Sequence, residues 1–198
     1  MRYDAEHKLR TRQRLLKEAA AAIRAEGPDR VGVAEIMAKA GLTHGGFYAH
    51  FRSKDDLIES AIAQMFDDAA RRYEKSTKDL DPAAALDSYL DFYLSAAHRD
   101  APERGCPLPS LSGDLARMPA AARKRFAEGA EGITNRIATL LHALGRPSPE
   151  RLAASTVAEL VGAVALARAT SDRGRSDAIL SASRVALRER LGLKGSTG

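Results

Sequence analysis

The sequence contains one cysteine, no tryptophan and few other aromatic residues, and none of its apolar runs approaches the roughly 18 residues of a membrane-spanning helix. Its first residues lack the apolar core of a signal peptide. Cys106, as the single cysteine, cannot form a disulfide within its own chain, which is typical of proteins in a reducing compartment. These absences predict a cytoplasmic globular protein with no membrane segment.

The residue patterns of common enzymes are also missing. No two of the five histidines stand at i and i+4, the spacing that places two imidazoles on one helix face for a metal. The sequence has no glycine-rich phosphate loop followed by Lys-Ser/Thr, and no Gly-x-Ser-x-Gly nucleophile motif. We therefore expect a protein that is not an enzyme and that has no metal and no cofactor.

Positive charge is concentrated at the beginning of the chain. Residues 1–54 hold 11 Lys and Arg against 6 Asp and Glu, whereas residues 55–198 hold 20 of each. The first quarter of the chain therefore carries the whole formal net charge of +5. This pattern is expected when a small basic segment binds phosphate, although a basic segment can also serve solubility alone.

Helical periodicity and helix-end signals run through the chain, and no alternating β pattern or internal repeat is present. Ser53 should begin a long helix, and Asp81 should begin another that reaches about His98. Pro109 is expected at the start of a short helix, and Ser176 at the start of the last one. The sequence predicts an all-α fold of about nine helices.

Two short helices are predicted close together, at residues 33–40 and 44–51, with the turn 41–43 between them. This arrangement is typical of a helix-turn-helix, whose second helix enters the DNA major groove. Thr43 stands at the N-cap of the second helix, where the free backbone N–H groups and the positive end of the helix dipole favour contact with phosphate.

Helical spacing separates the residues of the second helix into two sets. Phe47 and Phe51 are four residues apart on one helix face and should pack into the core formed with the neighbouring helices. His44 and Tyr48 are also four apart and lie on a different face. The glycines at positions 45–46 cost about 1 kcal/mol each in helix propensity, which is reasonable if the backbone must approach a base pair or phosphate closely.

The segment IMAKAGLTHGGFYAHFRSKDDLI is similar to the signature of the tetracycline-repressor (TetR/AcrR) family of bacterial transcriptional regulators. The strong likeness covers roughly residues 8–60, and the remainder agrees only in length and helical pattern. The matching positions are Ala40-Gly41-Leu42-Thr43, Phe47-Tyr48, His50-Phe51, Ser53-Lys54 and Leu57.

The resemblance implies an N-terminal helix-turn-helix DNA-binding domain, residues 1–54, and a C-terminal helical domain, residues 55–198, for effector binding and dimerisation. It implies a regulator, in the family's usual mode a repressor, that binds a palindromic operator as a homodimer and is released by a small-molecule effector. The alternative is a helix-turn-helix protein whose body is purely structural and senses nothing.

The family's DNA-reading roles fall on positions of this sequence that match the motif. Two departures concern Gly32, where the family usually has Ser or Thr, and Ala34, where some members have an arginine that contacts bases. Specificity is therefore expected to depend more on the recognition helix. The implied contacts are Thr43, His44, Gly45, Gly46, Tyr48 and His50, with Lys54 on phosphate.

The last two predicted helices, residues 150–171 and 177–192, are rich in small residues interleaved with aliphatic ones. They carry more apolar surface than one helix pair can bury, which favours a four-helix bundle formed by two chains, although the pair could also be internal core. The family resemblance implies that the middle helices enclose a cavity for a small, mostly apolar effector. Phe66, Tyr93 and Phe126 are our candidates to line that site, the alternative being that they are ordinary core.

Cys106 lies in a loop rich in Pro and Gly, before the short helix expected at Pro109. The helix dipole and the neighbouring Arg104 would both favour its thiolate form, so we include it in the effector site as a candidate sensor of electrophiles. A segment like this one occurs in a TetR-like subgroup with cysteine-based sensing. The alternative is a small buried hydrophobic residue.

Overall fold

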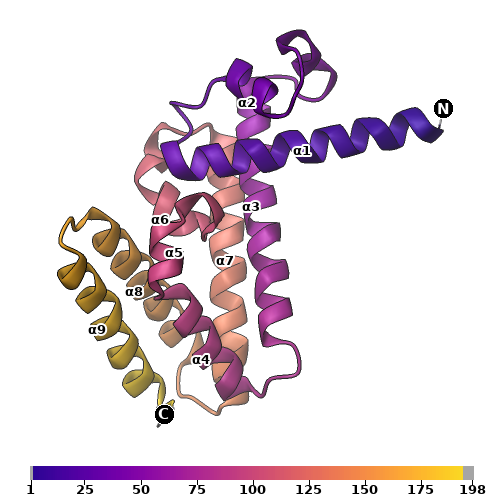
Figure 1. Ribbon diagram of the computed structural model, residues 1–198. Helices are drawn as coiled ribbons and strands as arrows, with labels where there is room; N and C mark the ends of the chain where they lie inside the picture. Colours follow the sequence, from indigo (N-terminus) through magenta and orange to yellow (C-terminus); the bar gives the residue numbers. More distant parts are fainter. Residues whose placement is uncertain (1, 194–198) are drawn as a thin grey trace. The chain divides into compact units, whose positions relative to one another are not determined.

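The computed structural model describes residues 2–193, with side chains from residue 6 onward (Figure 1). Over these residues the chain forms nine α-helices and three short 3₁₀ segments, with no β-strand. The predicted all-α fold is therefore confirmed.

The elements follow one another with short connections. In chain order they are α1 (Arg2–Glu26), α2 (Val33–Lys39), η1 (His44–Ala49), α3 (Lys54–Thr77), α4 (Pro82–Tyr93), α5 (Ala96–Asp100), η2 (Pro102–Arg104), α6 (Pro107–Leu111), η3 (Ser112–Arg117), α7 (Ala120–Ala143), α8 (Pro149–Ala169) and α9 (Arg173–Leu191).

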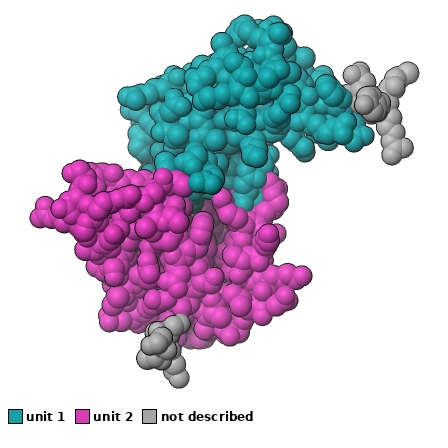
Figure 2. All heavy atoms as spheres, viewed as in Figure 1, with its two compact units in different colours: residues 1–68, 102–128 teal, residues 69–101, 129–198 magenta. Residues whose placement is uncertain are grey.

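The chain divides into two compact units, which Figure 2 shows in different colours. The first unit comprises residues 1–68 and 102–128, and the second comprises residues 69–101 and 129–198. The segment 102–128 is thus distant in sequence from the N-terminal helices but belongs to the same unit as they do.

The core of the first unit lies where α1, α2 and η1 meet. Leu15 and Ile23 of α1 and Met37 of α2 are completely buried. Phe47 and Phe51 are buried beside them, with their rings stacked at a centroid distance of 5.6 Å. The expectation that these two phenylalanines share the core face is confirmed, and their burial fixes which face of η1 points outward.

The segment 102–128 is tied to the N-terminal helices by polar contacts as well. Arg24 Nε donates a hydrogen bond to the Glu103 carbonyl oxygen at 2.8 Å. Arg125 on α7 forms an ion pair with Glu59 on α3, with 3.2 Å between Nε and Oε1. These contacts connect α1 and α3 to residues that lie 66 or more positions away in the sequence.

In the second unit, α8 and α9 pack on each other and are fastened to α4 and α5 by arginines. Buried Arg99 donates from Nη1 to Ser176 Oγ at 2.8 Å. Arg188 on α9 donates to both carboxylate oxygens of Asp87, at 2.6 and 3.1 Å, and to Asp91 at 2.9 Å. Because the Arg188–Asp87 pair is bidentate and mostly buried, it fixes the register of α9 against α4.

Two predicted helices differ in kind or extent. The segment expected as the second α-helix of the helix-turn-helix is a 3₁₀ helix over residues 44–49, because its two glycines weaken α-helix formation. The helix expected to reach His98 ends at Tyr93, and a new one begins after Ser95, whose Oγ accepts a hydrogen bond from His98 N at 3.1 Å.

Two predicted helix starts were wrong by a few residues. The short helix α6 begins at Pro107, not at Pro109, so both prolines lie in its first turn, where no N–H is needed. Helix α9 begins three residues before Ser176, because the Asp172 carboxylate accepts a hydrogen bond from Arg175 N at 2.8 Å and caps the helix there.

One described helix, α8, is long and apolar enough to cross a membrane by length and composition alone, so the expectation that no such run exists was wrong. Core helices of soluble proteins pass the same test. Of the residues in its most apolar part, 39% are buried inside the chain. Much apolar surface of α8 is therefore left uncovered by the chain itself.

Candidate nucleic-acid interface

The turn between α2 and η1 is held by two backbone hydrogen bonds. Leu42 N donates to the Met37 carbonyl oxygen at 2.8 Å, and Gly41 N donates to the Ala38 carbonyl oxygen at 2.9 Å. These two bonds form a Schellman motif, which places Gly41 in the left-handed region with φ at +68°. Because other residues are strained in that conformation, glycine sets the angle at which the chain leaves α2.

With Phe47 buried, the other side of η1 is exposed. Tyr48 is 73% exposed, although the edge-to-face contact with Phe47, at 5.3 Å between ring centroids, supports the base of its ring. The predicted DNA-reading residues therefore lie at an accessible surface. Thr43, His44, Gly45 and Tyr48 are exposed, while Gly46, His50 and Lys54 are half-buried.

The glycines of η1 differ in what surrounds them. A Cβ atom at Gly45 would meet nothing within 4 Å, and one at Gly46 would make an ordinary contact of 3.5 Å with Met37 Cε. Neither position has the positive φ that favours glycine. Packing inside the protein therefore gives no reason for glycine at position 45.

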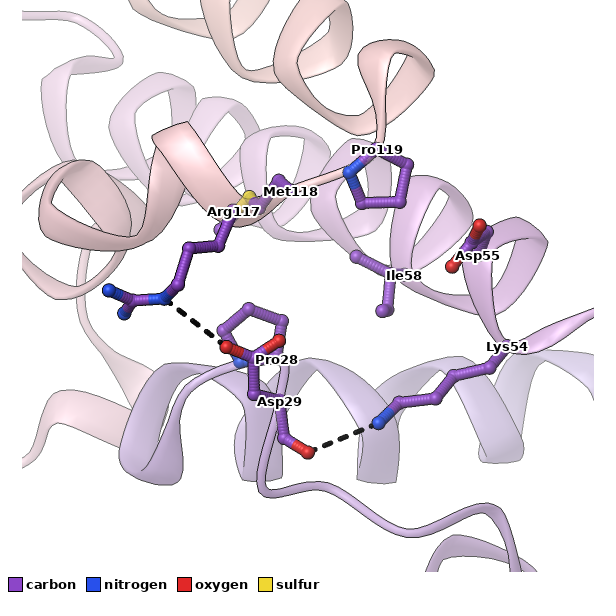
Figure 3. A pocket seen from close by; sticks show the side chains of 8 residues that line it. All are labelled: Pro28, Asp29, Lys54, Asp55, Ile58, Arg117, Met118 and Pro119. Carbon is purple, nitrogen blue, oxygen red and sulfur yellow. Dashed lines mark hydrogen bonds and ion pairs between the residues drawn. The ribbon is translucent and has the colours of Figure 1, made fainter.

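Lys54 begins α3 and faces a pocket of about 370 Å³ within the first unit (Figure 3). Its Nζ donates a hydrogen bond to the Asp29 carbonyl oxygen at 3.2 Å. The Asp29 carboxylate in turn accepts from Arg117 Nε at 3.3 Å. Sequence reasoning identified Lys54 but missed Asp29 and Arg117, because these contacts join positions 25 and 88 apart in the chain.

The caps around η1 and α3 are unequal. Ser53 Oγ accepts from Asp56 N at 3.1 Å, and the Asp56 carboxylate accepts from Arg52 N at 2.8 Å. The first of these bonds confirms Ser53 as the N-cap of the long helix, and Lys54 therefore lies in the first turn of that helix. Thr43 and Gly32 are at N-cap positions but make no side-chain cap bond.

His50 ends η1 and lies beside the cations of α1. Its Nδ1 atom is buried and has no hydrogen-bond partner. Burial, followed by the positive charges of Lys8 and Arg12, lowers the pKa of His50. Arg12 is itself held in place, since its Nη2 donates to Ser60 Oγ at 3.1 Å. Sequence reasoning named His50 but no residue of α1.

The four predicted effector residues are divided between the two compact units. Phe66 and Phe126 are buried in the first unit and meet edge to face at 5.8 Å between centroids. Cys106 is also in the first unit, 5% exposed, as the N-cap of α6. Tyr93 belongs to the second unit, where it is buried against His98 at 4.8 Å. Neither of the two described pockets contains any of these four residues.

The neighbour that was expected to favour the thiolate of Cys106 has another partner. Arg104 Nε forms an ion pair with Glu103 Oε1 at 3.1 Å, and the Arg104 side chain is 78% exposed. The expected effect of Arg104 on the Cys106 thiol stays a prediction.

A short helix, a glycine-capped turn and a second helical segment with an exposed face are the parts of a helix-turn-helix, the class of DNA-binding protein that the fold defines. Residues 15–61 match the family described as bacterial regulatory proteins, tetR family. A Bacillus subtilis protein described as an uncharacterised HTH-type transcriptional regulator, YfiR, is 25% identical over 103 residues, which are 52% of this chain and 50% of that protein. The chain thus spans about half the length of this relative.

Solved structures of TetR-family regulators have the same fold as this chain. A TetR transcriptional regulator from Chloroflexus aurantiacus is similar with a TM-score of 0.80 and 24% identity, covering 96% of this chain and 98% of that one. A TetR-family regulator from Agrobacterium tumefaciens is similar with a TM-score of 0.79 and 21% identity, covering 92% of this chain and 98% of that one. The reduced form of E. coli NemR is similar with a TM-score of 0.78 and 19% identity, covering 90% of this chain and 96% of that one. Together, the family match, the curated relative and these structures support a TetR-family regulator: the match lies in residues 15–61, and the structures share the fold over nearly the whole chain.

Proposed function

We propose that the chain is a cytoplasmic repressor that binds a palindromic operator as a homodimer and leaves it when an effector binds. The observation that carries the proposal is the accessible face of η1, inside the segment that matches the family. Gly45 supports it further, because nothing inside the protein needs glycine there, whereas a base pair or phosphate at close range would.

Within this proposal, residues 1–54 read the DNA and residues 55–198 dimerise and bind the effector. His44 and Tyr48 face the major groove, and Lys54 contacts the phosphate backbone. In a two-fold dimer the two recognition segments contact half-sites roughly 34–36 Å apart, or a multiple of that spacing. The proposed contacts are Thr43, His44, Gly45, Gly46, Tyr48, His50 and Lys54.

The dimer is proposed to form through α8 and α9. Leu166 of α8 is 61% exposed and Val185 of α9 is 51% exposed, although both are large apolar residues on long helices. In the most apolar part of α8, 39% of the residues are buried inside the chain, and the rest keep some accessible surface. A second copy packed across a two-fold axis would cover this surface as a four-helix bundle.

The effector is proposed to act on residues 55–198, with Phe66, Phe126 and Tyr93 near an apolar ligand. Electrophilic modification of Cys106 remains a second route for release. Because this thiol is 5% exposed, the route requires local opening before an electrophile can reach it.

The proposal is tested with the purified full chain and sheared genomic DNA of its source. Selection of bound fragments should enrich an inverted repeat, and light scattering should give the mass of a dimer. Failure to enrich any sequence over background would refute operator recognition. A set of apolar compounds and quinones should then include one that lowers operator affinity. Compounds that bind the dimer but leave operator affinity unchanged would favour the non-sensing alternative.

A further inference from the structure

The first turns of α1 project beyond the helices on which the rest of α1 packs (Figure 1). Residues 6–10 are all exposed, whereas Thr11, Leu15 and Leu16 farther along the helix are buried. This projecting end contributes nothing to the core. It is nevertheless fully helical, and it carries several of the cations that make the N-terminal quarter basic.

One side of this end faces the recognition segment. Lys8 and Arg12 are four residues apart, so they lie on the same side of α1. Arg12 marks that side, since its guanidinium lies 4.9 Å from the centre of the Phe51 ring, directly after η1. Lys8 is one turn farther out, and its charge acts on His50 together with those of His7 and Arg12.

These like charges are not neutralised within the part of the chain whose side chains are described. Arg10 has a carboxylate partner, Glu6, at 3.5 Å, but no described carboxylate lies within ion-pair distance of Lys8. Clustered cations repel one another, and a polyanion that approaches them removes the repulsion and releases counterions. The same cluster borders His50, a proposed DNA contact.

We propose that Lys8 on α1 and His50 at the end of η1 bind the same stretch of DNA phosphate backbone, so that the DNA interface extends onto the first turns of α1. This inference rests on the proposed operator binding and adds a site outside the helix-turn-helix. The contact is to phosphate, so it strengthens binding to every sequence and reads no base.

The test compares three lysines in the full-length protein. Lys8→Ala removes the proposed contact, and Lys54→Ala removes the contact expected within the helix-turn-helix. Lys17→Ala is the matched control, because Lys17 is exposed on the same helix but lies nine residues, or about two and a half turns, farther along on the opposite face. Circular dichroism and thermal unfolding verify that each variant is folded.

Binding is measured by fluorescence anisotropy on the selected operator and on unrelated duplex DNA between 50 and 200 mM salt. Because a dimer carries two copies of Lys8, Lys8→Ala should reduce the magnitude of the slope of log K against log salt by about 1.8 on both DNAs, which changes the affinity by about twelvefold across that range. Lys17→Ala should leave the slope unchanged. If Lys8→Ala has the same salt slope as wild type while Lys54→Ala has a slope of smaller magnitude, the proposed contact on α1 is wrong but operator binding still stands. If wild type itself shows no salt-dependent binding, the proposed function fails.

Discussion

Acid should destabilise the second unit through a single buried histidine. His98 is 3% exposed, and its Nδ1 bonds with the Tyr93 carbonyl oxygen at 2.7 Å. Burial lowers the pKa of His98 from 6.5 to about 4; the bond to the Tyr93 carbonyl opposes this shift, and the positive charges of Arg168 and Arg72 add to it. Folding therefore favours the neutral imidazole.

The size of the effect follows from this difference in pKa. Because the pKa is lowered in the folded state, the stabilisation is fully present above pH 6.5 and is lost as the pH falls toward 4. At about 1.4 kcal/mol per pKa unit the whole loss is roughly 3 kcal/mol, of which about 2 kcal/mol is lost by pH 5.

The measurement is urea unfolding followed by circular dichroism at about pH 7.5 and pH 5, at one fixed protein concentration. His98→Gln is the comparison, because glutamine does not titrate and its amide can still donate to the Tyr93 carbonyl oxygen. Wild type should lose roughly 2 kcal/mol more than the variant between the two pH values. Equal losses in both proteins would show that the charge of His98 does not control acid stability.

Three further predictions concern DNA reading, assembly and sensing. His44→Ala should reduce discrimination at particular operator positions, each worth roughly 1–3 kcal/mol, in competition against single-base variants. An even loss for every variant would instead make His44 a phosphate contact. Leu166→Glu should convert the dimer to monomer in light scattering, while Leu80→Glu, also at an exposed leucine, should not. Cys106→Ser should bind operator normally and stay bound when a quinone releases wild type; release of both proteins would exclude the thiol as the sensor.

Sequence patterns succeeded where the structure depends on local rules. The spacing of Phe47 and Phe51 identified the buried side of the recognition segment, because both rings must reach one small core. Ser53 was identified as a helix start, because its hydroxyl satisfies a backbone N–H three residues later. Gly41 was placed in the turn, and its positive φ explains why that position takes glycine.

The same patterns failed where distant residues decide the outcome. Ser176 resembles a helix cap, yet it is buried inside α9, where its Oγ donates to the Ala167 carbonyl oxygen at 2.7 Å and accepts from Arg99. A serine hydroxyl can satisfy a local N–H or a distant carbonyl, and sequence spacing alone does not distinguish these uses.

Lys54 shows how a local prediction gains meaning from a distant contact. An ammonium group has three donors, so the bond to the Asp29 carbonyl leaves two for a phosphate and holds Lys54 ready to make that contact. Arg117 holds Asp29 from the opposite side and belongs to residues 55–198, the part proposed to respond to the effector. Both side chains of the Asp29–Arg117 pair are more than 60% exposed, so the pair contributes at most about 1 kcal/mol to the stability of this contact. An effector acting through this pair would therefore change operator affinity by at most about fivefold, and stronger regulation would require a change in the geometry of the proposed dimer as well.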